Sequence, residues 1–288
     1  MLDPSKPIWI NEDTYQVIKD KKSSTELNKP KYKIMVATPV HSEVSIHYFQ
    51  ACLEFQKLCI KNNINVMFQV MKSSLVTQGR NLCVASFLDF KDATHLLFID
   101  SDIDFSFKSI LAMLEADKDV ISIPYPLKSI SWEKAFHYIE KGRIKSAKDL
   151  EHAVLNYPLR LPNANEVMIK KGVIEVTHSP TGSMLIKRSV FDKMTKAYPE
   201  LKIVQKTHIN GVLKDKENMW NFFDTLHDPE TKTYLGEDFA FCKRWREIGG
   251  KCHAFIDEYI THVGEYQYCG RLRDEMVDSD IDKTPKDK

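Results

Sequence analysis

The chain has 288 residues, of which 43% are hydrophobic and 28% are charged, and 41 basic against 40 acidic residues leave a formal net charge of +1. These values are ordinary for a globular protein with a substantial core, and they exclude a fibrous or low-complexity chain. They lack the strongly basic balance typical of nucleic-acid binding, so we expect no nucleic-acid partner. No apolar run approaches the roughly 20 residues that cross a bilayer, and residues 1–5 do not resemble a signal peptide. We therefore expect a cytoplasmic protein without a transmembrane segment.

Polar sequence at both ends brackets one central domain. Residues 1–30 are mixed and polar, and we expect an N-terminal arm there. Residues 271–288 contain few apolar side chains, which predicts a polar C-terminal tail. Residues 31–270 show no internal repeat and no second boundary, so a single domain is expected.

Strands and helices alternate along the first half of this domain. Four short apolar runs are typical of strands, and stretches with helical periodicity follow the first three. Strands that are apolar throughout indicate a mostly parallel sheet covered by helices on both faces, the α/β class. The expected strands are 34–37, 65–71, 95–99 and 119–123, and the expected helices are 43–61, 80–90 and 106–116.

The second half is less regular. Residues 127–170 predict one or two helices and a long connection, and residues 199–235, with scattered Gly, Asn, Asp and Pro, predict loops and short strands. The aromatic residues of 199–235 are expected either to order over a bound ligand or to pack at the periphery; they are Trp220, Phe222, Phe223 and Tyr234. Further strands are expected at 173–177, 183–186, 252–256 and 259–262, and further helices end at Met194 and cover 237–248.

Three carboxylates follow the apolar strand 95–99. Asp100 and Asp102 alternate along the chain, so in an extended backbone both face the same side, and Asp104 comes next. Carboxylates this close are unfavourable unless a cation neutralises them, and oxygen ligands favour Mg²⁺ or Mn²⁺. Magnesium commonly completes its shell with substrate phosphates. A solvated turn is the alternative, although a buried strand ending in D-x-D is not typical of a loop.

Two later positions are candidates for the same site. Asp238 lies in the first turn of the helix 237–248, on the side of its core residues. There it could act as a general base, or it could stabilise the helix dipole, and the two interpretations weigh evenly. His262 ends a short strand and could supply a further metal ligand, whereas a structural role is the ordinary alternative. His178 and His208 are weaker candidates.

Two glycine-containing segments could contact a ligand. Gly79-Arg80-Asn81 is expected to enter a helix, where exposed N–H groups and an arginine suit an anion. A capped helix start with a surface arginine is the alternative. Thr181-Gly182-Ser183 precedes a strand, and Gly182 would permit close approach of a ligand or simply form a tight turn.

In their order along residues 32–268, these motifs resemble glycosyltransferases of the GT-A fold. Each motif is weak alone, and the ordered series is the specific part. The chain is similar to small glycosyltransferases of bacteria, bacteriophages and large DNA viruses, which implies a Rossmann-like central sheet of the GT-A type. The series comprises Thr38-Pro39, Gly79-Arg80-Asn81, Phe98-Ile99-Asp100-Ser101-Asp102, Thr181-Gly182-Ser183, Gly236-Glu237-Asp238 and His262.

The resemblance implies an activity. It implies metal-dependent transfer of a sugar from a nucleotide-diphosphate donor, a UDP- or GDP-sugar, to a hydroxyl of a glycan, glycoprotein or other acceptor. Asp238 would then be the general base of an inverting reaction, with Glu237 as the fallback. Many members carry an acidic residue after the first or second strand to read uracil, but Met71-Lys72-Ser73-Ser74 stands here, so the base stays open.

The resemblance also implies roles for the other motif residues. Mn²⁺ or Mg²⁺ would be held by Asp100, Asp102 and His262, with Asp100 alternatively on the donor ribose. Residues implied to contact the nucleotide sugar are Thr38, Pro39, Arg80, Asp100, Ser101, Asp102, Thr181, Gly182 and Ser183.

Other classes stay open. The G-R-N and D-S-D segments also resemble retaining fungal mannosyltransferases. A haloacid-dehalogenase-type phosphohydrolase would use Asp100 as nucleophile with Asp102, but its motif usually lies near the N-terminus and carries Thr or Val where Ile103 stands. A nucleotidyltransferase would show a glycine-rich basic loop in place of His41-Ser42-Glu43. A sugar-binding module would not need D-x-D.

Overall fold

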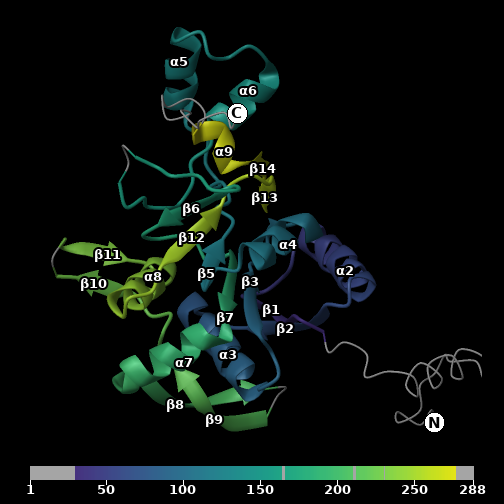
Figure 1. The fold of residues 1–288 in the computed structure, drawn as a ribbon, viewed down its shortest axis with the longest axis vertical. Coiled ribbons are helices and arrows are strands. Elements are labelled where there is room, and N and C mark those ends of the chain that lie inside the picture. Colours follow the sequence, from purple (N-terminus) through teal and green to yellow (C-terminus); the bar gives the residue numbers. More distant parts are fainter. Residues whose placement is uncertain (1–29, 164–165, 210–211, 230, 277–288) are drawn as a thin grey trace, which may run out of the picture. The chain divides into compact units, whose positions relative to one another are not determined.

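The computed structural model describes residues 30–163, 166–209, 212–229 and 231–276. Contacts divide the chain after Lys31, and the unit from Tyr32 onward contains a seven-stranded sheet in the order β2-β1-β3-β7-β5-β12-β6 (Figure 1). Five strands run parallel, and β7 and β6 run antiparallel to their neighbours. The strands are β1 (Lys33–Val40), β2 (Asn65–Lys72), β3 (His95–Ile99), β5 (Val120–Ser122), β6 (Val173–Val176), β7 (Ser183–Lys187) and β12 (Cys252–Phe255).

Helices cover both faces of this sheet, which explains why its central strands are apolar throughout. In β1, Ile34 and Val36 pack with the side chains of α2 and α4. Met35 and Ala37 point to the other face and join the core beneath α3, α7 and α8. The α/β class with a mostly parallel sheet is therefore confirmed. The helices of the described residues are α2 (Ile46–Lys61), α3 (Val76–Asp89), α4 (Phe107–Ala116), α5 (Trp132–Glu140), α6 (Ala147–Ala153), α7 (Arg188–Ala197), α8 (Glu237–Glu247) and α9 (Leu272–Met276).

Smaller sheets complete the described part of the chain. Two of them are hairpins and the third has three strands, in the order β14-β13-β4. The strands are β4 (Ile103–Asp104), β8 (Lys202–Ile209), β9 (Val212–Trp220), β10 (Leu226–Asp228), β11 (Thr233–Leu235), β13 (Ile260–Val263) and β14 (Gln267–Gly270). No helix among the described residues has both the length and the apolar character to cross a membrane.

Two expectations about local structure were wrong. The helix expected from Arg80 begins at Val76, so Gly79-Arg80-Asn81 lies inside α3 rather than in a loop before it. Residues 199–235 contain a long hairpin, β8–β9, that was not expected, in addition to the short strands β10 and β11, which fit the expectation. In both cases contacts distant in sequence outweigh local propensity, because α3 packs against β9 and β1.

The aromatic residues of 199–235 divide between core and surface. Phe222 and Phe223 are fully buried, so neither is available to order over a ligand. The Phe223 ring stacks on Phe241 of α8 with centroids 4.4 Å apart and meets Phe98 of β3 edge-on at 5.2 Å. Tyr234, by contrast, is 69% exposed. Phe223 therefore fixes the start of α8 against the centre of the sheet.

We predict that Phe223→Ala lowers the free energy of unfolding by about 3–5 kcal/mol, because a large buried ring leaves a cavity. Tyr234→Ala, on an exposed hairpin of the same region, should change it by less than about 0.5 kcal/mol. Urea denaturation followed by circular dichroism measures both. Equal, small losses would contradict the placement of Phe223 in the core.

Candidate active site

The strand order brings distant motifs to one edge of the sheet. Because β7 runs antiparallel between β3 and β5, its first residue pairs with the last residue of β3, Ser183 with Ile99. The Asp100 N–H donates to the Gly182 carbonyl at 3.0 Å, which places Thr181-Gly182-Ser183 beside the D-x-D segment. Carboxyl ends of parallel strands are where such sheets bind ligands.

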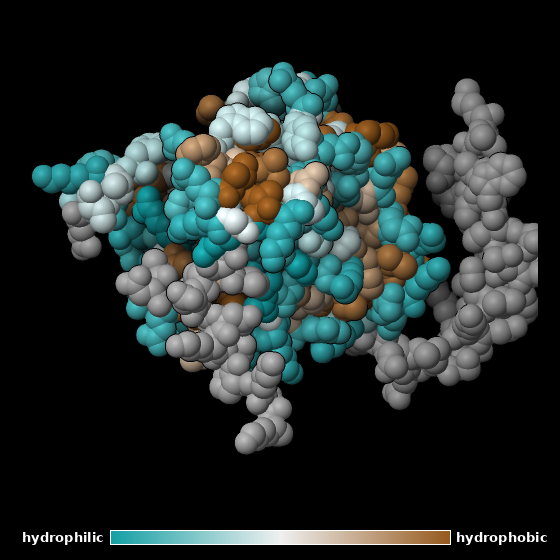
Figure 2. Space-filling model, turned by 90° about the horizontal axis from the view of Figure 1, so that it is seen from above, coloured by the Kyte–Doolittle hydropathy of each residue, from teal (hydrophilic) through white to brown (hydrophobic). Residues whose placement is uncertain are grey.

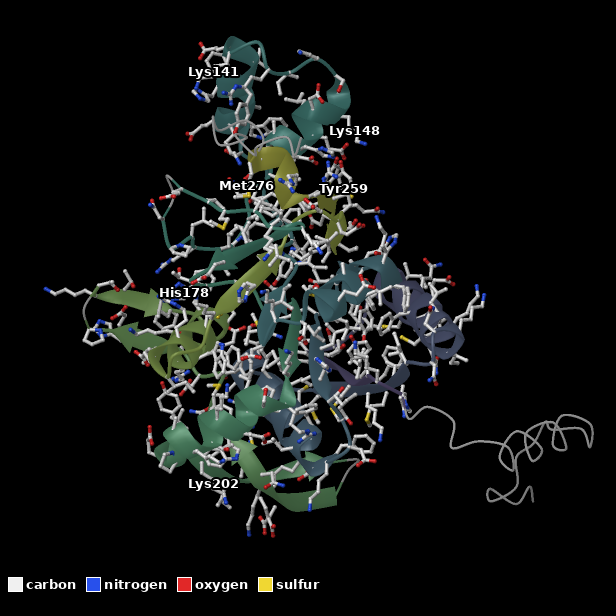
Figure 3. All side chains as sticks on the ribbon, viewed as in Figure 1. Lys141, Lys148, His178, Lys202, Tyr259 and Met276 are labelled. Atoms are coloured by element: carbon white, nitrogen blue, oxygen red, sulfur yellow. The ribbon has the colours of Figure 1, made fainter. Side chains whose placement is uncertain are left out.

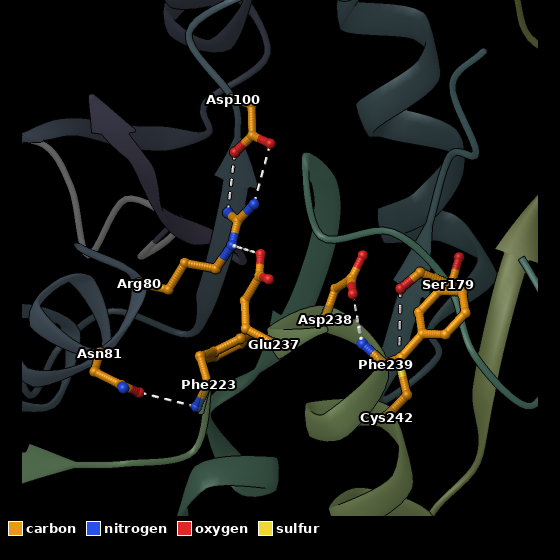
Figure 4. A network of polar contacts seen from close by, with 9 residues as sticks. All are labelled: Arg80, Asn81, Asp100, Ser179, Phe223, Glu237, Asp238, Phe239 and Cys242. Atoms are coloured by element: carbon orange, nitrogen blue, oxygen red, sulfur yellow. Dashed lines mark hydrogen bonds and ion pairs between the residues drawn. The ribbon is translucent and has the colours of Figure 1, made fainter. Parts of the chain in front are cut away.

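A buried arginine joins three elements at this edge. Arg80 of α3 is 3% exposed, and its two terminal nitrogens donate to the two oxygens of Asp100 at 3.0 Å each (Figure 4). Its Nε donates to Glu237 Oε1 at 3.2 Å. Burial alone would lower the pKa of Arg80, but the negative charges of Asp100 and Glu237 outweigh burial and raise it. The surface-arginine interpretation is wrong, and Asp100 is turned to Arg80.

Asp102 faces a different set of partners. Its Oδ2 lies 2.5 Å from Lys128 Nζ and 3.3 Å from His262 Nε2. The pairing of β13 with β4 sets this geometry, because His262 lies opposite Ile103. Burial raises the pKa of Asp102, yet the contacts with His262 and Lys128 prevail and lower it to about 2. The expected proximity of Asp102 and His262 is present in the structure.

The hydrogen bonds of His262 bear on cation binding. Its Nδ1 lies 2.8 Å from the Pro126 carbonyl oxygen, which can only accept, so Nδ1 carries a proton. A protonated ring would donate its Nε2 proton to Asp102 Oδ2, and a metal ion between the two atoms would take the place of that proton. A carbonyl oxygen that accepts from the other ring nitrogen is typical of a ligating histidine.

The protein itself offers few ligands for a metal. Among the described residues, no three His, Cys, Asp or Glu side chains gather closely enough to hold an ion. Asp102 and His262 fit as two ligands, provided that a substrate supplies the others and that Lys128 moves away from Oδ2. Both oxygens of Asp100 accept hydrogen bonds from Arg80, so a metal at Asp100 would have to share this carboxylate with the guanidinium.

Asp238 differs from its neighbour Glu237. It lies in the first turn of α8, and its Oδ1 accepts a hydrogen bond from the Phe239 N–H at 2.7 Å (Figure 4). Burial, then the charge of Glu237, raise the pKa of Asp238 to about 6. No ion pair of Asp238 occurs among the described residues. A carboxylate with this pKa suits a general base working near neutral pH.

Gly182 allows the close packing around Asp100. A Cβ atom at this position would lie 2.6 Å from Asp100 Oδ2 and 2.6 Å from the Tyr125 hydroxyl, so only glycine fits. The neighbouring hydroxyls of Thr181 and Ser183 are buried and have no hydrogen-bond partner within the described residues. Unsatisfied buried hydroxyls beside Asp100 are consistent with a polar ligand at this edge.

The remaining predicted residues lie at varied positions. Thr38 is buried, and its hydroxyl lies 2.6 Å from the Tyr48 hydroxyl of α2. Pro39 packs against Gly79, where an added Cβ would come within 3.0 Å. The Ser101 carbonyl accepts from the Ser45 N–H, which ties the D-x-D turn to the start of α2.

Two residues of the site were missed in the sequence. Tyr125 lies beside Gly182, and its ring meets His262 edge-on at 4.9 Å. Lys128 contacts Asp102. Both follow β5, and a buried strand that ends in Pro124 was the signal that could have drawn attention to the residues after it. His178 is buried 5.0 Å from the Phe239 ring, and the side chain of His208 lies outside the described residues.

Comparisons with known proteins give limited similarity. No family model matches the chain, and no curated protein matches it. Three similar solved structures are A197 from STIV, a glycosyltransferase involved in glycosylation of the major capsid of PBCV-1, and 4-diphosphocytidyl-2C-methyl-D-erythritol synthase from Anaerococcus prevotii.

The three structures share little sequence with this chain. A197 shares 17% identity at a TM-score of 0.42, over 81% of this chain and 86% of that one. The capsid glycosyltransferase shares 9% sequence identity at a TM-score of 0.29, over 58% of this chain and 66% of that one. The synthase shares 12% sequence identity at a TM-score of 0.29, over 75% of this chain and 99% of that one. Because all three TM-scores are below 0.5, these similarities are no evidence for the function of this chain. Evidence for function comes from the residues of the site.

We predict that Arg80→Met lowers the free energy of unfolding by about 3–5 kcal/mol, because it leaves Asp100 and Glu237 close together without a cation. Lys57→Met is the matched control, since Lys57 makes an exposed ion pair with Glu54 that contributes about 0–1 kcal/mol. Chemical denaturation at neutral pH measures both variants. A loss for Arg80→Met no greater than the control would show that the buried network does not hold the site together.

Proposed function

We propose that the chain is a metal-dependent glycosyltransferase of the GT-A type that moves a sugar from a nucleotide-diphosphate donor to an acceptor hydroxyl with inversion. One observation carries the proposal. A carboxylate with a raised pKa, Asp238, lies at the same sheet edge as an Asp102–His262 pair arranged for a cation, and Arg80 holds the two segments together.

Each group of residues in the candidate site would have a role in sugar transfer. Breaking the bond to the diphosphate builds negative charge on the leaving group, and a bound divalent cation would supply Lewis-acid stabilisation of that charge. Asp102 and His262 would hold Mn²⁺ or Mg²⁺. Lys128 would exchange Asp102 for a donor phosphate oxygen, adding a second positive charge at this place.

Asp238 would remove the proton from the attacking hydroxyl. Its pKa of about 6 keeps it ionised at neutral pH and still basic enough to accept a proton in the transition state. Glu237 is a weaker candidate for this role because its Oε1 accepts a hydrogen bond from Arg80. Asp100 would position Arg80, with both its oxygens engaged.

The same contacts weigh against a phosphohydrolase. In that class Asp100 would attack phosphorus, and a carboxylate nucleophile needs an oxygen that faces its substrate. Both oxygens of Asp100 instead accept hydrogen bonds from Arg80 at 3.0 Å. A retaining transferase would not need Asp238 as a base, so variants of Asp238 separate the two stereochemical alternatives.

We predict that one nucleotide sugar from a panel of UDP- and GDP-sugars raises the melting temperature with Mn²⁺, and that EDTA cancels the rise. Ligand at 100 times its Kd adds about 2.7 kcal/mol of stability. Asp102→Asn should lose the metal-dependent rise because a metal ligand is weakened. Asp104→Asn is the control, since Asp104 belongs to the same acidic run but lies on β4 opposite Thr261.

A rise that persists undiminished in Asp102→Asn would refute the assignment of Asp102 as a metal ligand. No rise with any nucleotide sugar, with either metal, would remove the support for a glycosyltransferase.

We predict that Asp238→Asn abolishes transfer but stabilises the fold. A general base contributes roughly 100- to 10,000-fold in rate. Because the folded pKa of Asp238 is about 6, above its ordinary 3.8, the ionised carboxylate destabilises the fold above pH 6. That penalty fades as the pH falls toward 3.8. The variant should therefore gain about 1–3 kcal/mol at pH 8 and almost nothing at pH 4.

The helix-dipole interpretation of Asp238 predicts the opposite change in stability for Asp238→Asn. If Asp238 served only the first turn of α8, Asp238→Asn would lose about 0.3–1 kcal/mol at pH 8 and leave transfer intact. Urea denaturation at the two pH values, together with transfer rates, distinguishes the outcomes. For the unaltered protein the rate should fall about tenfold for each pH unit below 6.

A further inference from the structure

The helix α2 carries an apolar stripe on a side that does not face the core. The core side of α2 is made by Tyr48, Phe55 and Cys59, among others. Four further large apolar side chains follow one another at spacings of three, four and seven residues, which aligns them along one line of the helix surface. These four residues, the α2 stripe, are Ile46, Phe49, Leu53 and Ile60, which are 62%, 50%, 51% and 72% exposed.

The described part of the chain leaves the α2 stripe uncovered. Within it, α2 meets β2, β4 and α4 and packs on the side of the sheet that carries Ile34 and Val36. The helix stands at the outer margin of this layer, and side chains point outward from it (Figure 3). Figure 2 shows hydrophobic side chains among hydrophilic ones on the side of the molecule that carries α2 in Figure 1. A contiguous exposed apolar surface of this kind marks an interaction site.

The α2 stripe is self-complementary about Leu53. Ile46 and Ile60 each lie seven residues from Leu53, about 10 Å along the helix axis in opposite directions. With a two-fold axis at Leu53 and antiparallel helices, Leu53 meets its own copy, and Ile46 lies at the level of Ile60 of the partner subunit. A contact between identical chains that closes after two copies requires this kind of self-complementarity.

The polar side chains beside the stripe are compatible with a second copy of the chain. Gln50 and Gln56 are exposed and uncharged. The exposed Lys57 already pairs with Glu54 of the same helix, with Nζ 3.2 Å from Oε2. Pairing of two copies along α2 would therefore bury no unpaired charge, which is what makes a contact of this kind affordable in free energy.

Charges at the two ends of α2 favour antiparallel copies. Lys61 is the last residue of the helix, Glu43 lies two residues before its N-cap Ser45, and both Lys61 and Glu43 are exposed. Antiparallel copies bring Lys61 beside Glu43 of the partner subunit, because the two residues lie at opposite ends of the helix. They also place the positive end of each helix dipole beside the negative end of the other. Parallel copies do neither.

We propose that two copies of this chain associate through α2, antiparallel about a two-fold axis at Leu53. The α2 stripe is about 20 Å long, from the rise of 1.5 Å per residue. Two helices in contact over this length bury on the order of 1,000 Å², at the small end of specific interfaces. We therefore expect a dimer that dissociates at micromolar concentration. The proposal does not depend on the proposed glycosyltransferase function.

Sedimentation of the full chain tests the association. The chain should form a dimer at high micromolar concentration. Leu53→Glu should weaken the dimer at least about 100-fold, because two carboxylates would be set against each other at the axis. Trp132→Glu is the matched control, since Trp132 is an apolar residue of α5 with 69% exposure, and it should leave the dissociation constant unchanged.

Three outcomes would overturn the proposal. They are a monomer at every micromolar concentration, a dimer that Leu53→Glu leaves intact, and a dimer that Trp132→Glu dissociates. Circular dichroism checks that Leu53→Glu stays folded, as expected for a side chain that is already 51% exposed. A monomer that binds phosphatidylglycerol vesicles only while Leu53 is unaltered would identify the stripe as a membrane surface and would likewise contradict the dimer.

Disulfide cross-linking tests the orientation of the copies without a new charge. Under oxidised glutathione, Leu53→Cys should link to its own copy at least tenfold faster than Ile60→Cys does. A mixture of Ile46→Cys and Ile60→Cys should give the mixed dimer. The unaltered chain is the background, since five of its cysteines are buried and Cys269 is half-buried. Absence of linked Leu53→Cys, or Ile60→Cys that links to itself as fast, would refute the antiparallel pair.

Discussion

The buried guanidinium of Arg80 is the constraint on which the site depends. A charged group out of water costs several kcal/mol, and only well-formed pairs offset that cost. Arg80 meets Asp100 from the end of β3 and Glu237 from the start of α8, so the charge of each element is compensated by the others. Arg80 of α3 thereby holds the end of β3 next to the start of α8. The Phe98 ring beneath it, 5.4 Å from the guanidinium carbon, adds an apolar wall.

The two aspartates of the D-x-D segment face different partners because the strand stops before them. Side chains two apart share a face only while the backbone stays extended, and β3 ends at Ile99. The next residues form a turn, and the short strand β4 then pairs with β13. Asp100 is therefore directed to Arg80, and Asp102 to His262. One carboxylate is thus engaged by the buried arginine, whereas the other contacts Lys128 and His262.

Much of the fold follows from local patterns, and the site follows only in part. The strands of the central sheet and most helices lie where apolar periodicity predicts them, because burial on both faces leaves a direct signature in β1 and β3. The insertion of β7 antiparallel between β3 and β5 has no such signature, since strand order is set by distant pairings. Lys128 and Tyr125 were missed for that reason. The buried position of Arg80 depended on α3 starting one turn early, which packing against β9 decides.

Glu237 and Asp238 are neighbouring carboxylates at one helix start that face different partners. Successive residues of a helix point about 100° apart, so the two side chains reach different surroundings. Glu237 meets Arg80, whereas Asp238 is half-buried beside the charge of Glu237, and burial and that charge raise its pKa to about 6. Neighbouring titratable groups whose environments push their properties apart are the usual mark of an acid–base site. The raised pKa means that the ionised Asp238 disfavours the fold at neutral pH, and the ion pairs of Arg80 with Asp100 and Glu237 lie directly beside it, at the start of the same helix.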